Sequence, residues 1–290
     1  MTVSIGEALQ KASERLSWAG VPESRKEARS LLAHILEVDW AVLITDPDKP
    51  VADASLSRFQ ELVSRRMTGE PAQYITGTQD FYGRRFEVNP DVLIPRPETE
   101  GLIETVVPFV SSANSPFWIC DIGTGSGCIA ITLLCEKPSA QAIGVDISEA
   151  ALEVAKRNAK AHNVTNRVSF IQSDCFNALT RDITFDLIVS NPPYVSANVL
   201  QGLQREVRDH EPRVALTPGD DGLAIIRRLI NEAPPFLKPG GQLVIEIGFD
   251  QSEKIAGLLD PEVWELLQIA PDLQQIPRIV VLRRLGRTTD

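Results

Sequence analysis

The stretch that decides the fold is Phe117-Trp-Ile-Cys-Asp-Ile-Gly-Thr-Gly-Ser-Gly-Cys128, an apolar run that leads into a glycine-rich turn. Residues 117–122 favour a buried strand, and the glycines after them allow the backbone to turn sharply and a ligand to approach the amides. A helical pattern follows at about 127–136. Strand, glycine turn and helix in this order predict the first unit of an α/β domain.

The same alternation continues toward the C-terminus. Short apolar runs rich in β-branched residues recur, each bounded by turn residues, and a helical stretch at 149–162 separates two of them. Near-continuous apolar strands that alternate with helices indicate a parallel sheet covered by helices on both faces. The further strands expected are Gln141–Ile147, Val168–Gln172, Phe185–Ser190, Gly241–Ile247, and 263–270 with 278–284 as a closing pair.

The N-terminal part has the pattern of a small helical domain. Ser4-Ile-Gly-Glu7 and Ser24-Arg-Lys-Glu27 are capping-box patterns, Gly20 and Gly69 are suitable helix ends, and apolar residues between them recur at helical spacing. Residues 72–90, with aromatic and β-branched residues among glycines, suggest a β-hairpin. We therefore expect a helical domain at 1–70, a hairpin linker at 71–90 and an α/β domain at 91–290.

Composition argues against several classes of protein. With 29 basic and 39 acidic residues the net charge is −10, which is unfavourable for stable binding to nucleic-acid phosphates. No uncharged apolar run reaches about 18 residues, so no membrane span is expected. The first residues lack the basic and apolar regions of a signal peptide, so we expect a cytoplasmic protein. The 4 cysteines contain no C-x-x-C pair and the 3 histidines are dispersed, so no metal site is expected.

The glycine turn differs from that of dinucleotide-binding folds. The dinucleotide fingerprint needs its third glycine at position 128, where this chain has Cys128. A pyrophosphate ligand is therefore disfavoured, although the turn can still bring backbone amides close to a small ligand. The turn consists of Gly123, Thr124, Gly125, Ser126 and Gly127.

Acidic residues follow the next two strands. Asp146 closes the second strand, 23 residues after Gly123, and a carboxylate there can accept two hydrogen bonds from a ribose diol. Asp146 could instead cap the following helix, but Ser148 is the better cap, which leaves Asp146 free for a ligand. Asp174, after the third strand, is either a turn residue or a partner for an adenine amino group. Together the acids favour a nucleoside carried without a diphosphate, with S-adenosylmethionine as the obvious candidate.

The most specific motif is Asn191-Pro-Pro-Tyr194, at the end of the fourth strand. Pro192 and Pro193 cannot extend a central strand, so the motif forms a rigid corner unless it is merely a turn. An amide or exocyclic amino nitrogen is a poor nucleophile because its lone pair is delocalised. If the Asn191 side-chain oxygen and the Pro192 carbonyl accept its two N–H groups, they orient it and favour the transition state, and Tyr194 can stack on the planar group. The motif therefore predicts N-methylation of such a nitrogen.

With these motifs the chain resembles the class I S-adenosylmethionine-dependent methyltransferases that modify bacterial peptide chain release factors, the protein-(glutamine-N5) methyltransferases. The resemblance covers most of the chain. The segments that carry it are Gly69-Glu-Pro-Ala-Gln-Tyr-Ile75, Leu93-Ile-Pro-Arg-Pro-Glu-Thr-Glu100, Asp121–Gly127, Asp146, Asn191–Tyr194, Glu211-Pro212, Asp221-Gly-Leu223 and Glu246-Ile-Gly248.

The resemblance implies a Rossmann-like, mostly parallel seven-stranded sheet with helices on both faces, a small N-terminal helical domain and a linking β-hairpin. It implies methyl transfer from S-adenosylmethionine to the side-chain nitrogen (N5) of the glutamine in the Gly-Gly-Gln motif of class 1 release factors, which the N-terminal helices would contact away from that motif. Among the site residues it implies that the cofactor is bound by Gly123–Gly127, Asp146 and Asn191, with Cys175 next to Asp174 beside the adenine. It implies that the glutamine amide is held by Asn191, Pro192, Pro193 and Tyr194.

Other activities compete with this hypothesis. DNA adenine-N6 methyltransferases use a similar Asn-Pro-Pro-Tyr corner, but they must flip a base from the duplex and usually have a basic groove. The net charge of −10 and the Leu93–Glu100 segment favour the release-factor enzymes instead. N-methylation of another protein or of a small molecule is a further alternative. A non-catalytic protein that senses S-adenosylmethionine would be expected to lack Asn191 or Asp146, and both are present.

Overall fold

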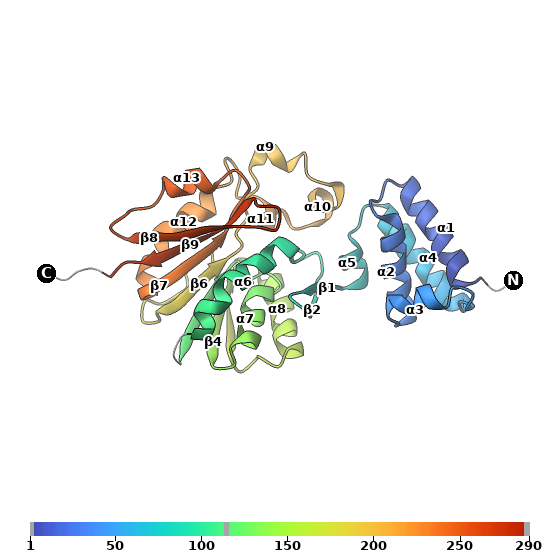
Figure 1. Ribbon diagram of the computed structural model, residues 1–290, viewed down its shortest axis with the longest axis horizontal. Coiled ribbons are helices and arrows are strands. Elements are labelled where there is room, and N and C mark those ends of the chain that lie inside the picture. Colours follow the sequence, from blue (N-terminus) through green and yellow to red (C-terminus); the bar gives the residue numbers. More distant parts are fainter. Residues whose placement is uncertain (1–2, 113–115, 287–290) are drawn as a thin grey trace. The chain divides into compact units, whose positions relative to one another are not determined.

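The structure is a computed structural model that describes residues 3–112 and 116–286. The chain forms two compact units, which Figure 1 colours along the sequence. The first unit contains the chain up to Thr78 together with Gln204–His210, and the second contains Gln79–Leu203 and the chain from Glu211 onward. The division expected from the sequence, at residues 70 and 90, does not include this return of 204–210 to the first unit.

The first unit is helical, and each main helix buries one apolar stripe. Leu16, Leu31, Phe59 and Val63 lie in its core, as the helical spacing of apolar residues predicts. A short helix at Trp40–Thr45 was not expected. The helices of this unit are α1 (Ile5–Trp18), α2 (Ser24–Leu36), α3 (Trp40–Thr45), α4 (Asp53–Met67), α5 (Ala72–Thr76) and α10 (Arg205–His210).

One of the two expected capping boxes is present. Ser4 Oγ accepts a hydrogen bond from the Glu7 amide, and the Glu7 carboxylate accepts one from the Ser4 amide, so the box at the start of α1 is confirmed. The box at Ser24 is wrong. The cap position of α2 is taken by Glu23 in a left-handed conformation (φ 47°), and Ser24 Oγ hydrogen-bonds instead with Ser13 Oγ at 3.3 Å.

The expected hairpin at 72–90 is shorter than its aromatic pattern suggested. Only β1 (Thr78–Phe81) and β2 (Arg84–Glu87) are strands. Residues Ala72–Thr76 form helix α5, which Pro71 precedes and Gly77 ends in a left-handed conformation (φ 75°). Tyr74 and Ile75 are therefore helical, because proline pre-sets a helix start and glycine accommodates its end.

The second unit is built around a seven-stranded sheet in the order β5-β4-β3-β6-β7-β9-β8. The first five strands of this order pair in parallel, and β9 is antiparallel to both β7 and β8. The expected mostly parallel sheet with a closing pair is therefore confirmed. The strands are β3 (Phe117–Ile122), β4 (Ala140–Asp146), β5 (Val168–Gln172), β6 (Phe185–Ser190), β7 (Leu237–Glu246), β8 (Trp264–Pro271) and β9 (Pro277–Arg284).

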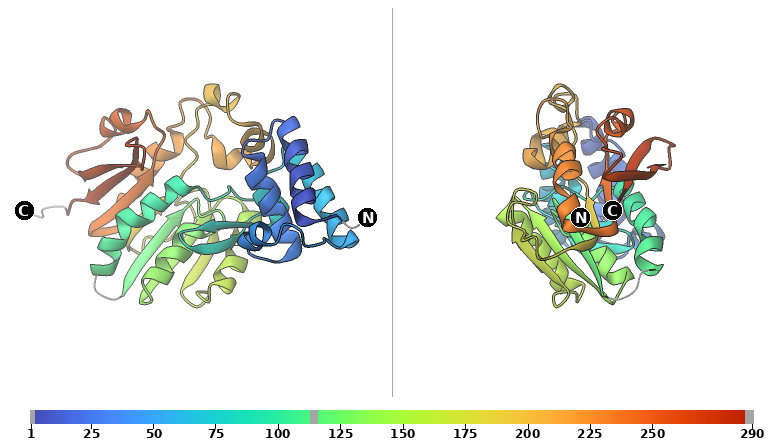
Figure 2. Two further views of the ribbon diagram at one scale, coloured as in Figure 1. Left: turned by 45° about the vertical axis from the view of Figure 1, so that its right-hand side comes forward. Right: turned by 90° about the vertical axis from the view of Figure 1, so that its left-hand side faces the viewer.

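Helices cover both faces of this sheet, as expected. Successive strand residues point to opposite sides, so Ile119 packs in the core beneath α6 and α7, and Cys120 packs in the core beneath α12. The right-hand view of Figure 2 shows α6 in green and α12 in orange on opposite sides of the strands. The helices of this unit are α6 (Pro97–Ser112), α7 (Cys128–Glu136), α8 (Glu149–Ala161), α9 (Ala197–Leu200), α11 (Arg213–Leu216), α12 (Ala224–Glu232), η1 (Pro234–Phe236) and α13 (Ser252–Ala256).

The strand order reverses between β3 and β6. From β3 the chain builds outward through β4 and β5, then returns to the other side of β3 with β6 and β7. At such a point the loops after adjacent strands part and leave a crevice at the carboxyl edge. The glycine turn follows β3 and Asn191 follows β6, so the topology brings both motifs to this crevice.

Candidate active site

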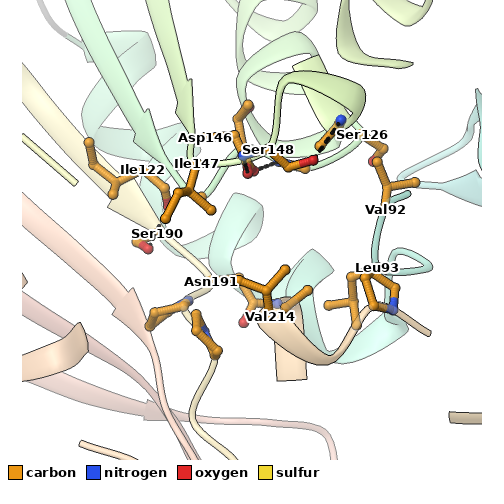
Figure 3. Close-up of a pocket in the computed structure, with 18 of the residues that line it drawn as sticks. Val92, Leu93, Ile122, Ser126, Asp146, Ile147, Ser148, Ser190, Asn191 and Val214 are labelled. Carbon is orange, nitrogen blue, oxygen red and sulfur yellow. Dashed lines mark hydrogen bonds between the residues drawn. The ribbon is translucent and has the colours of Figure 1, made fainter. Parts of the chain in front are cut away.

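A pocket of the second unit lies at the carboxyl ends of β3, β4 and β6 (Figure 3). All but two of the site residues expected from the sequence line it, and the two exceptions are Gly127 and Tyr194. Its walls also include the apolar side chain of Leu93, from the Leu93–Glu100 segment, and those of Val92 and Val214, which no motif singled out. The expected residues on its wall are Gly123, Thr124, Gly125, Ser126, Asp146, Asp174, Cys175, Asn191, Pro192 and Pro193.

The glycine turn bridges β3 and β4 through its backbone. The amides of Gly123 and Thr124 both donate to the Val145 carbonyl, at 2.8 and 2.9 Å. The three glycines have positive φ angles of 74°, 53° and 80°, a region that favours glycine. A Cβ atom at Gly127 would come within 2.8 Å of Ile131 and 3.2 Å of Ala155. Gly127 therefore allows α7 to begin close against α8. Gly127 packs between these helices and does not line the pocket.

Asp121 supports the turn from below. Its Oδ2 accepts hydrogen bonds from the Thr124 hydroxyl at 2.7 Å and from the Ala130 amide at 3.2 Å. Burial raises the pKa of this carboxyl to about 7, and the two hydrogen bonds oppose that rise. Within residues 3–112 and 116–286, Oδ1 of Asp121 has no hydrogen-bond partner.

Asp146 accepts hydrogen bonds from two backbone amides beside the pocket. Its Oδ2 accepts from the Gly125 amide and its Oδ1 from the Ser148 amide, both at 2.9 Å. Ser148 caps α8 through the Ala151 amide, so the expected helix cap is confirmed. A carboxylate oxygen has two acceptor sites, so each oxygen retains one for a ligand. Burial raises the pKa of Asp146.

Asp174 and Cys175 follow β5 and line the pocket. Asp174 is exposed and forms an ion pair with Arg228 of α12, with 2.6 Å between Oδ1 and Nη1. The same arginine pairs with Glu232 at 2.9 Å. Cys175 is buried with a φ of 51°, and burial raises the pKa of its thiol to about 11. At neutral pH Cys175 is thus a neutral wall residue and no thiolate nucleophile.

The Asn-Pro-Pro-Tyr segment forms a corner directly after β6. The Ser190 hydroxyl donates to the Ile122 carbonyl at 2.6 Å, which ties the end of β6 to the end of β3. Asn191 Nδ2 donates to Thr99 Oγ1 at 2.9 Å. Because the oxygen and nitrogen of an amide lie on opposite sides of Cγ, Oδ1 of Asn191 is directed away from Thr99. The corner therefore offers an acceptor rather than a donor.

Tyr194 is anchored behind the corner. Its hydroxyl donates to Glu246 Oε1 at 3.2 Å, and its carbonyl accepts from Gln251 Nε2 at 3.1 Å. Burial raises the pKa of the Tyr194 hydroxyl, and the nearby Glu246 carboxyl raises it further. The structure does not bring the Tyr194 ring among the residues that line the pocket, so stacking on a substrate stays a prediction.

The Leu93–Glu100 segment forms another wall and is held by a buried acid. Glu211 accepts from Arg96 at 2.5 Å and from the Ile94 amide at 3.2 Å. The carboxyl side chain of Glu211 is nearly fully buried. Glu211 and Glu246 stand in segments that carry the sequence resemblance, but sequence reasoning assigned neither a role, because burial and partners cannot be read from spacing.

Comparison with known proteins identifies the family. Residues 7–77 match the model "PrmC N-terminal domain", and residues 114–260 match the model "Methyltransferase domain". A release factor glutamine methyltransferase of Nitratidesulfovibrio vulgaris is 43% identical over 278 residues, covering 95% of this chain and 94% of the relative. One from Cereibacter sphaeroides is 42% identical over 279 residues, covering 96% and 97%. The chain belongs to the release factor glutamine methyltransferase family.

Members of this family are methyltransferases, and a solved structure agrees with the fold. A methyltransferase from Pyrococcus furiosus superposes with a TM-score of 0.51 at 16% identity, covering 81% of this chain and 100% of that one. At this identity the likeness concerns the fold alone.

In the described part of the chain, no group of three or more His, Cys, Asp or Glu could hold a metal ion. Of the helices described here, none is long and apolar enough to cross a membrane.

Proposed function

We propose that this methyltransferase transfers the methyl group of S-adenosylmethionine to the side-chain amide nitrogen (N5) of the glutamine in the Gly-Gly-Gln motif of class 1 peptide chain release factors. The names of the relatives, release factor glutamine methyltransferase, support this substrate. The observation that carries the proposal is the orientation of Asn191, whose nitrogen is bound to Thr99 and whose oxygen is therefore available to a substrate N–H.

The residues of the pocket fit S-adenosylmethionine. A Cβ atom at Gly123 or Gly125 would have no neighbour nearer than 4.0 Å, so the turn leaves open space for a ligand against its backbone. Asp146 has acceptor capacity for a ribose diol, and Asp174 with Cys175 would border the adenine. When bound, S-adenosylmethionine supplies an electrophilic methyl group on a positively charged sulfur. The apolar wall residues Val92, Leu93 and Val214 would exclude water from this group.

The corner would hold the glutamine amide by its two N–H groups. Asn191 Oδ1 is one acceptor, and the Pro192 carbonyl is the other. Pro192 and Pro193 have no N–H groups and restrict the backbone, so the carbonyl keeps a fixed direction. Positive charge grows on the nitrogen during transfer, and two preorganised oxygens stabilise it. Tyr194, anchored at Glu246, would present its ring to the amide plane.

The domain organisation supports a protein substrate. The helical domain expected at 1–70 would contact the release factor away from the Gly-Gly-Gln motif, and the segment 71–90 would link it to the catalytic domain at 91–290. A net charge of −10 argues against a stable nucleic-acid complex. Adenine in DNA is therefore the weaker substrate hypothesis, although it also has an exocyclic NH₂ group.

The test is methyl transfer from labelled S-adenosylmethionine to an unmodified class 1 release factor. Parallel reactions contain the same factor with its Gly-Gly-Gln glutamine changed to alanine, and duplex DNA. We expect label on the intact factor alone. Label on the alanine variant would mean that another protein nitrogen is the acceptor, and label on DNA would replace the protein substrate altogether.

A further inference from the structure

A chain of three polar side chains, Thr99, Glu246 and Tyr194, lies beside Asn191. Asn191 Nδ2 donates to Thr99 Oγ1 at 2.9 Å, and Thr99, in the first turn of α6, is 2% exposed. The Thr99 hydroxyl also lies beside the carboxyl of Glu246, the last residue of β7, which is 1% exposed, and it lowers the pKa of that carboxyl. Tyr194 donates its hydroxyl to the same carboxyl at 3.2 Å. Side chains of α6 and β7 thus meet a side chain of the corner itself on one side of the Asn191 amide.

The carboxylate of Glu246 decides which of these groups donates a hydrogen bond and which accepts one. A carboxylate only accepts hydrogen bonds, and a hydroxyl has a single proton to donate. When Glu246 is ionised, the Thr99 proton must point toward Glu246, and the Thr99 oxygen must then accept. Only the NH₂ side of Asn191 can satisfy it. When ionised, the carboxylate therefore fixes, through Thr99, the orientation in which the Asn191 nitrogen faces Thr99 and the Asn191 oxygen faces away from it.

This arrangement is costly to the fold. Burial raises the pKa of Glu246 to about 7, and the neighbouring Glu98 adds to the rise. Hydrogen bonds with Thr99 and Tyr194, and the charge of Arg278, act in the opposite direction. An apolar side chain of similar volume would avoid the cost of removing a charge from water. A buried carboxyl beside a pocket is therefore a candidate for a role in that pocket.

We propose that Glu246 and Thr99 are positioning residues that hold the Asn191 amide in the orientation that accepts from the substrate nitrogen. The inference rests on the proposed function, because it concerns how the same site recognises a planar NH₂ group. If the Thr99 hydroxyl is lost, the Asn191 amide can turn over and present its own NH₂ group to the substrate NH₂. Two donors then face each other, and the acceptor needed for transfer is missing.

The test compares Thr99→Val with Thr99→Ser, because valine has the shape of threonine without the hydroxyl and serine keeps the hydroxyl. Methyl transfer to the unmodified release factor is measured together with the dissociation constant for S-adenosylmethionine by calorimetry. We expect Thr99→Val to lower kcat about 10- to 100-fold, the size of the loss when a side chain that orients a metal ligand is removed. We expect Thr99→Ser to recover most of this loss, and cofactor affinity to stay at the wild-type value in both.

A second variant tests which group donates and which accepts between Glu246, Thr99 and Asn191. Glu246→Gln keeps the shape of the side chain but can donate to Thr99, which frees Asn191 to turn over. Glu246→Gln should lower kcat about as much as Thr99→Val does. The double variant should have nearly the same kcat as either single variant, because both changes remove the same constraint on the Asn191 amide. Melting curves and cofactor binding establish that the variants are folded.

The outcomes separate the inference from the proposed function. Equal kcat for Thr99→Val, Thr99→Ser and the wild type would overturn the positioning role while the proposed function stands. Additive losses in the double variant would also overturn it, because the two residues would then act independently. A wild-type chain that does not methylate the factor would overturn both.

Discussion

At the scale of single residues, Asn191 is where sequence and geometry agree most closely. We predict that Asn191→Ala lowers kcat by about 10²–10³, the range found for removing one preorganised electrostatic contact. The dissociation constant for S-adenosylmethionine should change far less than kcat. Steady-state methyl transfer to the release factor checks this, with Asn231→Ala, an exposed asparagine on α12, as the control. Near-wild-type turnover of Asn191→Ala at saturating cofactor would remove Asn191 from the proposed mechanism.

Asp146 has two tasks in the structure, and its replacement should affect both. Its carboxylate fixes the Gly125 and Ser148 amides and would also accept from the ribose. We predict that Asp146→Ala weakens S-adenosylmethionine binding by about 1.5–3 kcal/mol, the usual contribution of a hydrogen bond to a charged group. Calorimetry measures this, and Asp182→Ala, an exposed acid outside the pocket, serves as the control. An unchanged affinity in Asp146→Ala would show that Asp146 only supports the turn.

Glu246 should make stability depend on pH. Burial raises its pKa to about 7 in the folded chain, whereas an unfolded glutamate titrates near about 4.3. Between these values the folded state binds more protons than the unfolded state, so the free energy of unfolding falls as the pH rises through this window. We predict that Glu246→Gln loses less stability than the wild type between pH 5 and pH 8, as measured by urea unfolding. Parallel pH dependence in the two proteins would contradict the raised pKa.

At the scale of elements, two glycines allow the cost of a positive φ angle to be separated from the cost of a steric clash at Cβ. Gly127 and Gly240 have nearly the same φ, 80° and 79°. A Cβ at Gly127 would meet Ile131 at 2.8 Å, whereas a Cβ at Gly240 would have no neighbour within 4 Å. We predict that Gly240→Ala costs about 1–2 kcal/mol, from backbone strain alone. Gly127→Ala should cost at least about 1 kcal/mol more, because α7 must move from α8. Urea unfolding of both variants checks this, and equal losses would show that the α7–α8 contact adjusts freely.

The elements also show where sequence reasoning succeeds and where it ends. The strands and the two loop motifs could be predicted, because buried parallel strands and their glycine and proline turns have strong local patterns. The helix at Ala72–Thr76 could not be predicted, because its aromatic and β-branched residues favour a strand. Only the flanking Pro71 and Gly77 indicate a helix. The partners of Thr99 and Glu246 could not be predicted either. Thr99 and Glu246 are 147 residues apart in the sequence, and only the topology of the sheet brings their segments together.

At the scale of the whole molecule, the chain enters the helical unit twice. After Leu203 it leaves the catalytic unit, forms α10 in the first unit, and returns at Glu211, which binds the pocket wall at Arg96. Within the first unit, Glu206 of α10 pairs with Arg66 at 2.5 Å. The segments that flank α10 thus carry the Asn191 corner on one side and the wall residue Val214 on the other.

Arg66 links α10 to α2 and α4 within the helical unit. It is 4% exposed and pairs with Glu27 of α2 at 2.9 Å as well as with Glu206. Its neighbour Arg65 is 42% exposed and pairs with Glu70. We predict that Arg66→Met lowers the free energy of unfolding by about 2–3 kcal/mol, because it leaves two carboxylates without their shared partner. Arg65→Met, which loses a largely exposed pair, should cost at most about 1 kcal/mol.

Urea unfolding compares these two variants, and limited proteolysis reports on α10 itself. Cleavage within 204–210 should accelerate in Arg66→Met and stay near the wild-type rate in Arg65→Met, because the first change alone frees the helix that carries Glu206. Glu206→Gln should accelerate cleavage at the same place with a smaller loss of stability, since Arg66 keeps Glu27. If Arg66→Met were cleaved at the wild-type rate, the ion pair with Arg66 would not be what holds α10 in the helical unit.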